Sequence, residues 1–175
     1  MKAKACVLIA ATLMAWGLKR HYADARADDL WWVLTPTARV VEVMTGATFA
    51  PVAGEGYFER DRLFLIEKSC AGINFMIAAF GMLVVALLRH AAFGVPAAGV
   101  LGVSLAASYS ATVLVNAARI AVAMWLAVHP RVLSTFSAAD VHRVQGIIVY
   151  FGGLVLVYEL VQRLDRVAAS RETRL

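Results

Sequence analysis

The chain changes from polar to apolar within residues 67–75, which read Glu-Lys-Ser-Cys-Ala-Gly-Ile-Asn-Phe. Most of the acidic side chains lie before this stretch, and no charged residue follows it until Arg89. A long uncharged apolar run of this kind predicts a helix that enters a membrane. Cys70 lies at the point of entry, so the same stretch indicates both the fold class and a candidate reactive group.

The composition also indicates an integral membrane protein. Hydrophobic residues make up 61% of the 175 residues, whereas a soluble domain usually has about 45–50%. The formal net charge is +5, but the basic residues flank the apolar runs, as they do in membrane topologies. We therefore predict an all-α integral membrane protein, folded as a single membrane domain, that contacts a lipid bilayer and no nucleic acid.

Four apolar segments are candidates for transmembrane helices. They are predicted at residues 5–20, 72–88, 95–127 and 146–162, the third with an external extension. The first is short, because a spanning helix needs about 17–25 residues, and it resembles a signal peptide with a cleavage site at residues 23–25. Lys19, Arg20 and His21 follow its apolar run directly, so we interpret it as a retained transmembrane helix with interfacial ends.

The distribution of basic residues predicts the topology. With four spans, the positive-inside rule places the basic N-terminus, Arg89 and the arginine-rich tail at residues 163–175 in the cytoplasm. Residues 21–69 and 129–144 then lie outside it. The chain is predicted to be a multi-pass membrane protein with both termini in the cytoplasm.

The polar region at residues 21–69 is expected to lie along the outer surface of the membrane. A short interfacial helix is expected around residues 28–34, and Thr35-Pro36 is typical of the start of a second one, which Gly46 can end. A turn-forming Gly-Glu-Gly sequence precedes residues 57–66, whose loose alternation predicts a short external β-hairpin.

Three residues that can carry chemistry share one membrane face in this topology. Cys70 begins the second helix, Arg119 lies near the end of the third, and His142 comes just before the fourth, so all three are predicted at the external face. The positive end of a helix and a nearby guanidinium both favour a thiolate. A histidine can accept the thiol proton and return it to a leaving amine. These residue types together predict a cysteine nucleophile.

Neighbouring amide side chains are candidates for positioning a substrate. Asn74 comes one turn after Cys70, and Asn116 shares a helix face with Arg119. Gln145 follows His142 by three residues, the same spacing that separates Asn116 from Arg119. The chain has two cysteines and neither a Cys-x-x-Cys nor a His-Glu-x-x-His motif, so no disulfide framework, metal or other cofactor is expected.

Each of the three residues also has a purely structural interpretation. A lone cysteine can be a small packing residue, an arginine at a helix end can reach the interface, and a histidine next to Arg143 can be an exposed loop residue. Arg119 is the one charged residue between positions 91 and 128, and burying such a residue in a membrane is costly. The three residues together carry more weight than any of them alone.

The order of these motifs resembles the exosortase/archaeosortase family of membrane cysteine enzymes. The resemblance extends over residues 67–151 and rests on SCAG at 69–72, NAARI at 116–120 and His142 before a final helix. Upstream sequences similar to the short exosortase K subgroup are WW (31–32), TPTA (35–38) and GEGY (54–57). The chain is much shorter than a typical exosortase and has fewer spans.

The resemblance implies an activity and a substrate class. Cys70 would be the nucleophile, His142 the general acid/base, and Arg119 the group that stabilises the thiolate or the oxyanion. The substrates would be exported proteins whose C-terminal tail combines a short motif, a transmembrane helix and a basic cluster, cut at the outer face of the inner membrane through an acyl-thioester. A non-catalytic membrane scaffold or assembly subunit and a membrane cysteine acyltransferase with a lipid donor are the alternatives.

Overall fold

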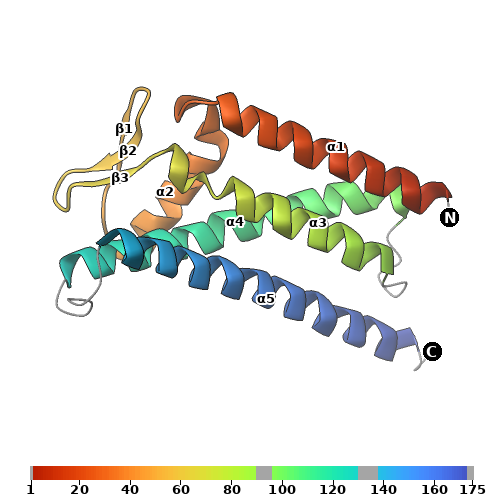
Figure 1. Cartoon of the computed structure of the whole chain (residues 1–175). Helices are drawn as coiled ribbons and strands as arrows, with labels where there is room; N and C mark the ends of the chain where they lie inside the picture. The colour runs from red at the N-terminus through yellow and green to blue at the C-terminus, as the bar shows by residue number, and fades with distance from the viewer. Residues whose placement is uncertain (1, 90–95, 130–137, 173–175) are drawn as a thin grey trace. The chain divides into compact units, whose positions relative to one another are not determined.

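The computed structural model describes residues 2–89, 96–129 and 138–172, and this part of the chain is mostly helical (Figure 1). The long helices are α1 (Lys2–Asp24), α2 (Trp31–Thr45), α3 (Ile73–Arg89), α4 (Ala97–Val128) and α5 (Ala138–Glu172). Two short 3-10 helices are η1 (Asp28–Leu30) and η2 (Lys68–Ala71). The strands are β1 (Ala50–Val52), β2 (Gly56–Glu59) and β3 (Phe64–Ile66).

The chain divides into two compact units, each made of separate stretches of sequence. The first unit comprises Met1–His21, Ile73–Ala111 and Gly153–Leu175. The second comprises Tyr22–Gly72 and Thr112–Gly152, so it holds the sheet, η2, the end of α4 and the start of α5. The helices α4 and α5 are each divided between the two units.

Three segments of the described chain are long and apolar enough to cross a membrane: Lys68–Arg89, Gly99–Val128 and Arg143–Val167. They correspond to the second, third and fourth predicted spans and confirm the prediction of long apolar helices there. The helix α1, whose apolar run is short between basic ends, is not among the three.

The helix α5 is longer at both ends than the predicted span. It begins at Ala138, within the predicted external loop, and continues to Glu172, within the predicted tail. The added segments are rich in Ala and Arg and contain neither Gly nor Pro, so their intrinsic preference favours helix. The remainder of the predicted loop, residues 130–137, lies outside the described residues.

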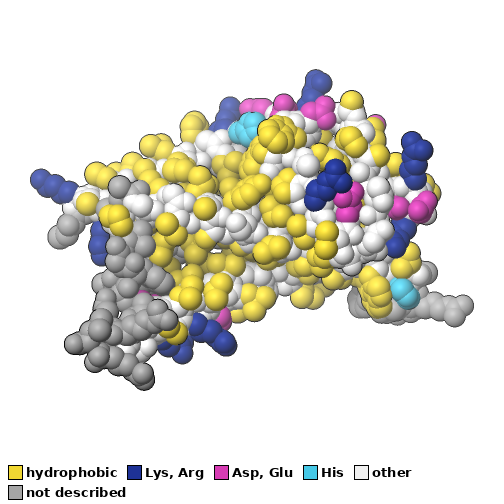
Figure 2. Space-filling view, turned by 180° about the vertical axis from the view of Figure 1, so that it is seen from behind, with side chains coloured by type: hydrophobic (Ala, Val, Ile, Leu, Met, Phe, Trp, Pro, Cys, Tyr) yellow, Lys and Arg dark blue, Asp and Glu magenta, His cyan; other side chains and the backbone are white. Residues whose placement is uncertain are grey.

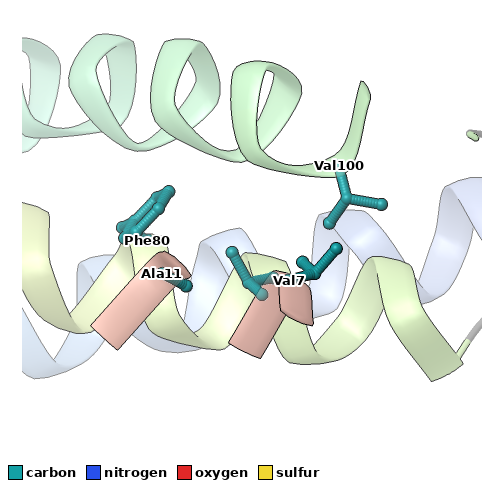
Figure 3. Close-up of a cluster of buried hydrophobic side chains, with 5 residues drawn as sticks. Val7, Ala11, Phe80 and Val100 are labelled. Carbon is teal, nitrogen blue, oxygen red and sulfur yellow. The ribbon is translucent and has the colours of Figure 1, made fainter. Parts of the chain in front are cut away.

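The first unit is built around apolar contacts between three helices. Val7 and Ala11 of α1, Phe80 and Val84 of α3, and Val100 of α4 form one buried cluster, in which the labelled side chains point toward one another (Figure 3). The Lys4 ammonium donates a 2.8 Å hydrogen bond to the carbonyl oxygen of Leu88 in the last turn of α3. Such a bond satisfies one of the carbonyls that a helix C-terminus leaves without an intrahelical partner.

A second apolar cluster of the first unit joins α3 to α5. Leu83 and Ala86 of α3 pack against Val161 of α5. The helix α3 therefore buries side chains on two faces, as expected of a central helix in a helical bundle. By contrast, α5 leaves many large apolar side chains exposed, and hydrophobic side chains cover much of the surface seen in Figure 2. Exposed apolar helix surface of this kind suits contact with lipid.

The helix α4 carries a polar ridge along its buried side. Ser104, Ser108, Thr112 and Asn116 follow one another at a spacing of four and are all completely buried. Residues four apart lie above one another on a helix, so these four polar side chains line one side of α4. Ser108 donates a hydrogen bond to the Leu105 carbonyl of its own helix, as serines inside helices often do.

The helix α2 packs one apolar face into the second unit. Its buried side chains are Val33, Leu34, Thr37, Ala38 and Val41. The predicted division of this region at Thr35-Pro36 is wrong, because α2 runs unbroken from Trp31 with Pro36 inside it. Pro36 is the sixth residue of α2, so the helix gives up the bond that an N–H there would donate to the Trp32 carbonyl. Burial of the apolar face offsets this loss and holds the two halves together. The helix ends, as predicted, at Gly46, which has a φ of 69°.

The three strands form one antiparallel sheet in the order β1-β2-β3, beside α2 (Figure 1). The hairpin of β2 and β3 confirms the prediction for residues 57–66. The strand β1 was missed, because Pro51 at its centre removes a backbone donor and disfavours a strand assignment. The Thr35 hydroxyl of α2 hydrogen-bonds the Tyr57 hydroxyl of β2, which links the helix to the sheet.

Carboxylates hold the loops around this sheet in place by accepting backbone N–H groups. Asp28 accepts from Gly54 in the β1–β2 turn at 2.9 Å, and Glu59 accepts from Arg62 in the β2–β3 turn at 2.7 Å. Glu42 accepts from Phe49 just before β1 at 2.8 Å. This last hydrogen bond, more than the neighbouring Arg39, holds the pKa of Glu42 below its ordinary value.

We predict that Glu42→Gln destabilises the protein at neutral pH by about 1 kcal/mol or less, because it weakens a charge-assisted bond at a partly exposed site. The folded-state pKa is the lower one, so this stabilisation is present above the unfolded value of about 4.3 and is lost as the pH falls through the folded value. Thermal unfolding in detergent between pH 7 and pH 3 should show the two proteins converging on acidification. Arg39→Ala, which leaves the bond to Phe49 intact, should cost less, and a difference that persists at pH 3 would contradict this account.

Candidate functional site

Cys70 lies in a short segment between the sheet and the membrane-length helix α3. The 3-10 helix η2 ends at Ala71, Gly72 adopts a left-handed φ of 68°, and α3 begins at Ile73. Cys70 was predicted to begin this helix, but it lies in η2 and precedes α3. Its N–H donates to the Glu67 carbonyl at 2.9 Å, and its side chain is only 6% exposed.

The segment η2 is tied to the end of α1 by Lys68. The Lys68 ammonium donates to the Ala23 carbonyl at 3.0 Å and lies 5.2 Å from the centroid of the Tyr22 ring. The Tyr22 hydroxyl in turn donates to the Lys68 carbonyl at 3.5 Å. Burial raises the pKa of Tyr22 above its ordinary value, and the neighbouring Cys70 and Glu67 side chains raise it further. The phenol thus keeps its proton at neutral pH and stays a donor next to the thiol segment.

A polar chain of contacts leads from the Cys70 thiol to a carboxylate. The Ser69 hydroxyl lies 3.9 Å from the Cys70 sulfur and donates a 2.7 Å hydrogen bond to Glu67 Oε1. A hydroxyl can accept one hydrogen bond while it donates another, so the Ser69 hydroxyl joins the thiol to the carboxylate.

Asn116 of α4 and Tyr150 of α5 hold the backbone of Cys70. The Asn116 amide donates to the Cys70 carbonyl oxygen, and the Tyr150 hydroxyl donates to Asn116 Oδ1 at 2.8 Å. Asn116 is completely buried, so both ends of its amide are satisfied inside the protein. The close approach of α4 is possible because Gly72 has no side chain: a Cβ there would lie 3.1 Å from Thr112 Cγ2 and 3.3 Å from Asn116 Cγ.

Arg119 lies one turn beyond Asn116 and contacts the same tyrosine. Its guanidinium carbon is 5.3 Å from the centroid of the Tyr150 ring, within the range of a cation–π interaction, and the residue is 8% exposed. Gln145 of α5 donates to the Arg119 carbonyl at 2.6 Å. Gly146 forms the surface beneath the guanidinium, since a Cβ on Gly146 would lie 3.2 Å from Arg119 Nε.

The other two predicted site residues have different positions. His142 belongs to α5, one turn before Gly146, and its side chain lies outside the described part of the structure. Asn74 belongs to the first unit, where its exposed amide accepts a 2.7 Å hydrogen bond from Lys19. The break at Gly72 means that Cys70 and Asn74 do not share a continuous helix, so the one-turn spacing does not put them on one helix face.

Tyr150, Tyr22 and the Ser69–Glu67 pair were not predicted from the sequence. A signal for Tyr150 did exist, because an amide such as Asn116 inside an apolar helix needs a buried partner and a tyrosine in another apolar helix can supply one. Nothing in the sequence pattern selects Tyr150 over the other tyrosines. The position of Ser69 next to the cysteine could have suggested its contact, but the bond to Glu67 depends on the 3-10 turn.

Comparison with known proteins gives no match: no protein-family model, no curated protein and no solved structure is similar to this chain.

Replacing Gly146 by alanine tests the surface beneath Arg119. An alanine in a helix interior usually stabilises it by about 1 kcal/mol relative to glycine. Gly152 lies in the same helix with open space around its Cα, so we predict that Gly152→Ala raises the unfolding midpoint in detergent. In Gly146→Ala the contact with the guanidinium should cancel or reverse this gain. Equal effects of the two substitutions would contradict the close packing of Arg119 on α5.

Replacing Gly72 by alanine tests the close approach of α4. Gly46 and Gly72 have nearly the same left-handed φ, 69° and 68°, but open space surrounds only Gly46. Gly46→Ala should therefore lower the free energy of unfolding only through the strain of a left-handed alanine, by about 1–2 kcal/mol. Gly72→Ala should lower it by at least about 1 kcal/mol more, because the added methyl group also presses on Thr112 and Asn116. Unfolding of the two variants under identical detergent conditions measures the difference, and equal losses would argue against the contact.

Proposed function

We propose that this protein is an exosortase-like membrane cysteine peptidase or transpeptidase that cleaves the C-terminal tails of exported proteins. One observation carries the proposal: Cys70 and Arg119, far apart in the chain, contact the same hydrogen-bonded Asn116–Tyr150 pair. The sequence resemblance to exosortases involves the same cysteine and arginine and adds His142.

The chemistry assigns one step to each residue. The Cys70 sulfur attacks the carbonyl carbon of the scissile peptide, and His142 takes the thiol proton. The tetrahedral intermediate then collapses: the C–N bond breaks, the leaving amine receives the proton from His142, and an acyl-thioester remains on Cys70. An amine or a water molecule attacks this thioester and releases the transferred or hydrolysed product.

Arg119 is suited to stabilising negative charge in this reaction. It is almost completely buried, and a fixed positive charge acts more strongly on a nearby oxyanion or thiolate where water is excluded. The Tyr150 ring and the Gly146 surface limit the directions in which its guanidinium can lie. Asn116 positions the nucleophile, because its hydrogen bond to the Cys70 carbonyl fixes the backbone that carries the thiol.

The proposed setting is the bacterial inner membrane. In this arrangement α1 adds a fourth span to the three long apolar helices, both termini lie in the cytoplasm, and the site lies at the outer face. A substrate's own transmembrane helix would lie in the bilayer beside the enzyme, with its short recognition motif at the level of Cys70. The apolar surface that α5 leaves exposed supports contact with lipid or with such a helix.

Replacement of the three residues tests the function. The reporter is a secreted protein carrying the motif–helix–basic tail of an exported protein from the same cell, and immunoblotting follows its processing. Cys70→Ala should abolish processing, His142→Ala should reduce it to near background, and Arg119→Ala should slow it about 100-fold or more, as expected for loss of an oxyanion donor. Cys6→Ala is the matched control, because Cys6 is an exposed cysteine in α1, outside the proposed site.

Unchanged processing in Cys70→Ala would refute the peptidase proposal. If the reporter instead loses a lipid modification in that strain, the acyltransferase alternative gains support. If neither changes while assembly of a membrane complex fails in Arg119→Ala, the scaffold alternative is favoured.

A further inference from the structure

The two outer edges of the three-stranded sheet differ in their ability to bind another strand. In the described chain β1 and β3 each pair only with β2, so the far side of each is an open edge. An open edge presents backbone N–H and C=O groups that an extended peptide can pair with.

The backbone of Leu65 faces the open edge of β3. In an antiparallel pair, residues alternate between those whose N–H and C=O face the partner and those whose groups face away. The Ile66 carbonyl faces β2, since a Cβ on Gly56 would lie 2.2 Å from its oxygen, and Ile66 is opposite Tyr57. The next residue along β3, Leu65, therefore directs its N–H and C=O outward.

The same alternation places Pro51 at the open edge of β1. Tyr57 is opposite Ile66 and directs its backbone groups toward β3, and therefore away from β1. Pro51 is opposite Tyr57 on β1, so the backbone groups of Pro51 face away from the sheet. Proline has no N–H, and a proline at an edge prevents the addition of a further strand. The edge of β1 is thus blocked at the position that corresponds to Leu65 on β3, while the edge of β3 remains able to pair.

The open edge leads directly to the candidate nucleophile. The strand β3 ends at Ile66, and the Glu67 carbonyl that follows it accepts the N–H of Cys70 at 2.9 Å. A strand laid along Leu65 in the direction of β3 therefore points with its C-terminal end toward the segment that carries Cys70.

We propose that the open edge of β3 binds the extended segment of the substrate that precedes the cleaved bond, as an added strand parallel to β3. The proposal rests on the proposed function, since it concerns the same reaction at Cys70. The parallel direction follows from the order of the substrate, in which the bound segment comes before the cleaved bond. Binding through backbone groups requires an extended conformation of the bound segment.

A proline at position 65 should close this edge as Pro51 closes the other. Leu65→Pro removes an outward N–H and leaves the bonds between β2 and β3 intact, so we expect processing of the tail reporter to fall about tenfold or more. Leu65→Val, which keeps the N–H, should process the reporter normally. Pro51→Ala, which opens the opposite edge, should also leave processing unchanged. Full processing in Leu65→Pro would overturn the proposal.

Photo-crosslinking gives a second test that does not depend on turnover. Benzoylphenylalanine is placed at position 65, or at position 51 as the matched control, in a Cys70→Ala background that retains uncut reporter. We expect light-dependent crosslinks to the reporter from position 65 and not from position 51. Absence of the crosslink at 65, or equal crosslinks from both positions, would overturn the proposal, and a processing defect in Leu65→Pro would then be attributed to misfolding.

The two proposals fail in different ways. If Cys70→Ala leaves processing unchanged, the peptidase function and the edge proposal both fall. If Cys70→Ala abolishes processing while Leu65→Pro retains it, only the edge proposal falls.

Discussion

The buried hydrogen bond from Asn116 to the Cys70 carbonyl is the contact on which the second unit depends. It joins η2 to α4, and the Tyr150 hydroxyl extends it to α5. An amide buried without partners would cost several kcal/mol in an apolar interior. The three segments must therefore come together in one arrangement for the amide to be satisfied, and that arrangement brings Arg119 to the same tyrosine.

Glycines make this arrangement possible at two points where helices meet the polar groups. Gly72 allows α4 to approach η2, and Gly146 allows the Arg119 guanidinium to lie on α5. Around the sheet, carboxylates, Glu42 among them, hold the loops by accepting backbone donors. The thiol segment is thus fixed from the helices on one side and from the sheet on the other.

Much of the fold could be predicted from the sequence, because apolar runs determine membrane-length helices directly. The β2–β3 hairpin and the end of α2 at Gly46 followed from turn-forming residues. The prediction failed where long-range packing overrides local preference: α2 continues through Pro36, and β1 forms despite Pro51. Of the candidate site, Cys70 and Arg119 were selected by residue type and position, but Tyr150 could not be, since only the packing of α5 on α4 makes it a partner.

The polar ridge of α4 has a consequence for how this helix packs. Ser104, Ser108, Thr112 and Asn116 mark one side of an otherwise apolar helix. Rotation of α4 about its long axis would take the Asn116 amide away from the Cys70 carbonyl and the Tyr150 hydroxyl and leave it unsatisfied. The ridge therefore favours one rotational setting of α4, and that setting decides the direction in which Arg119 projects.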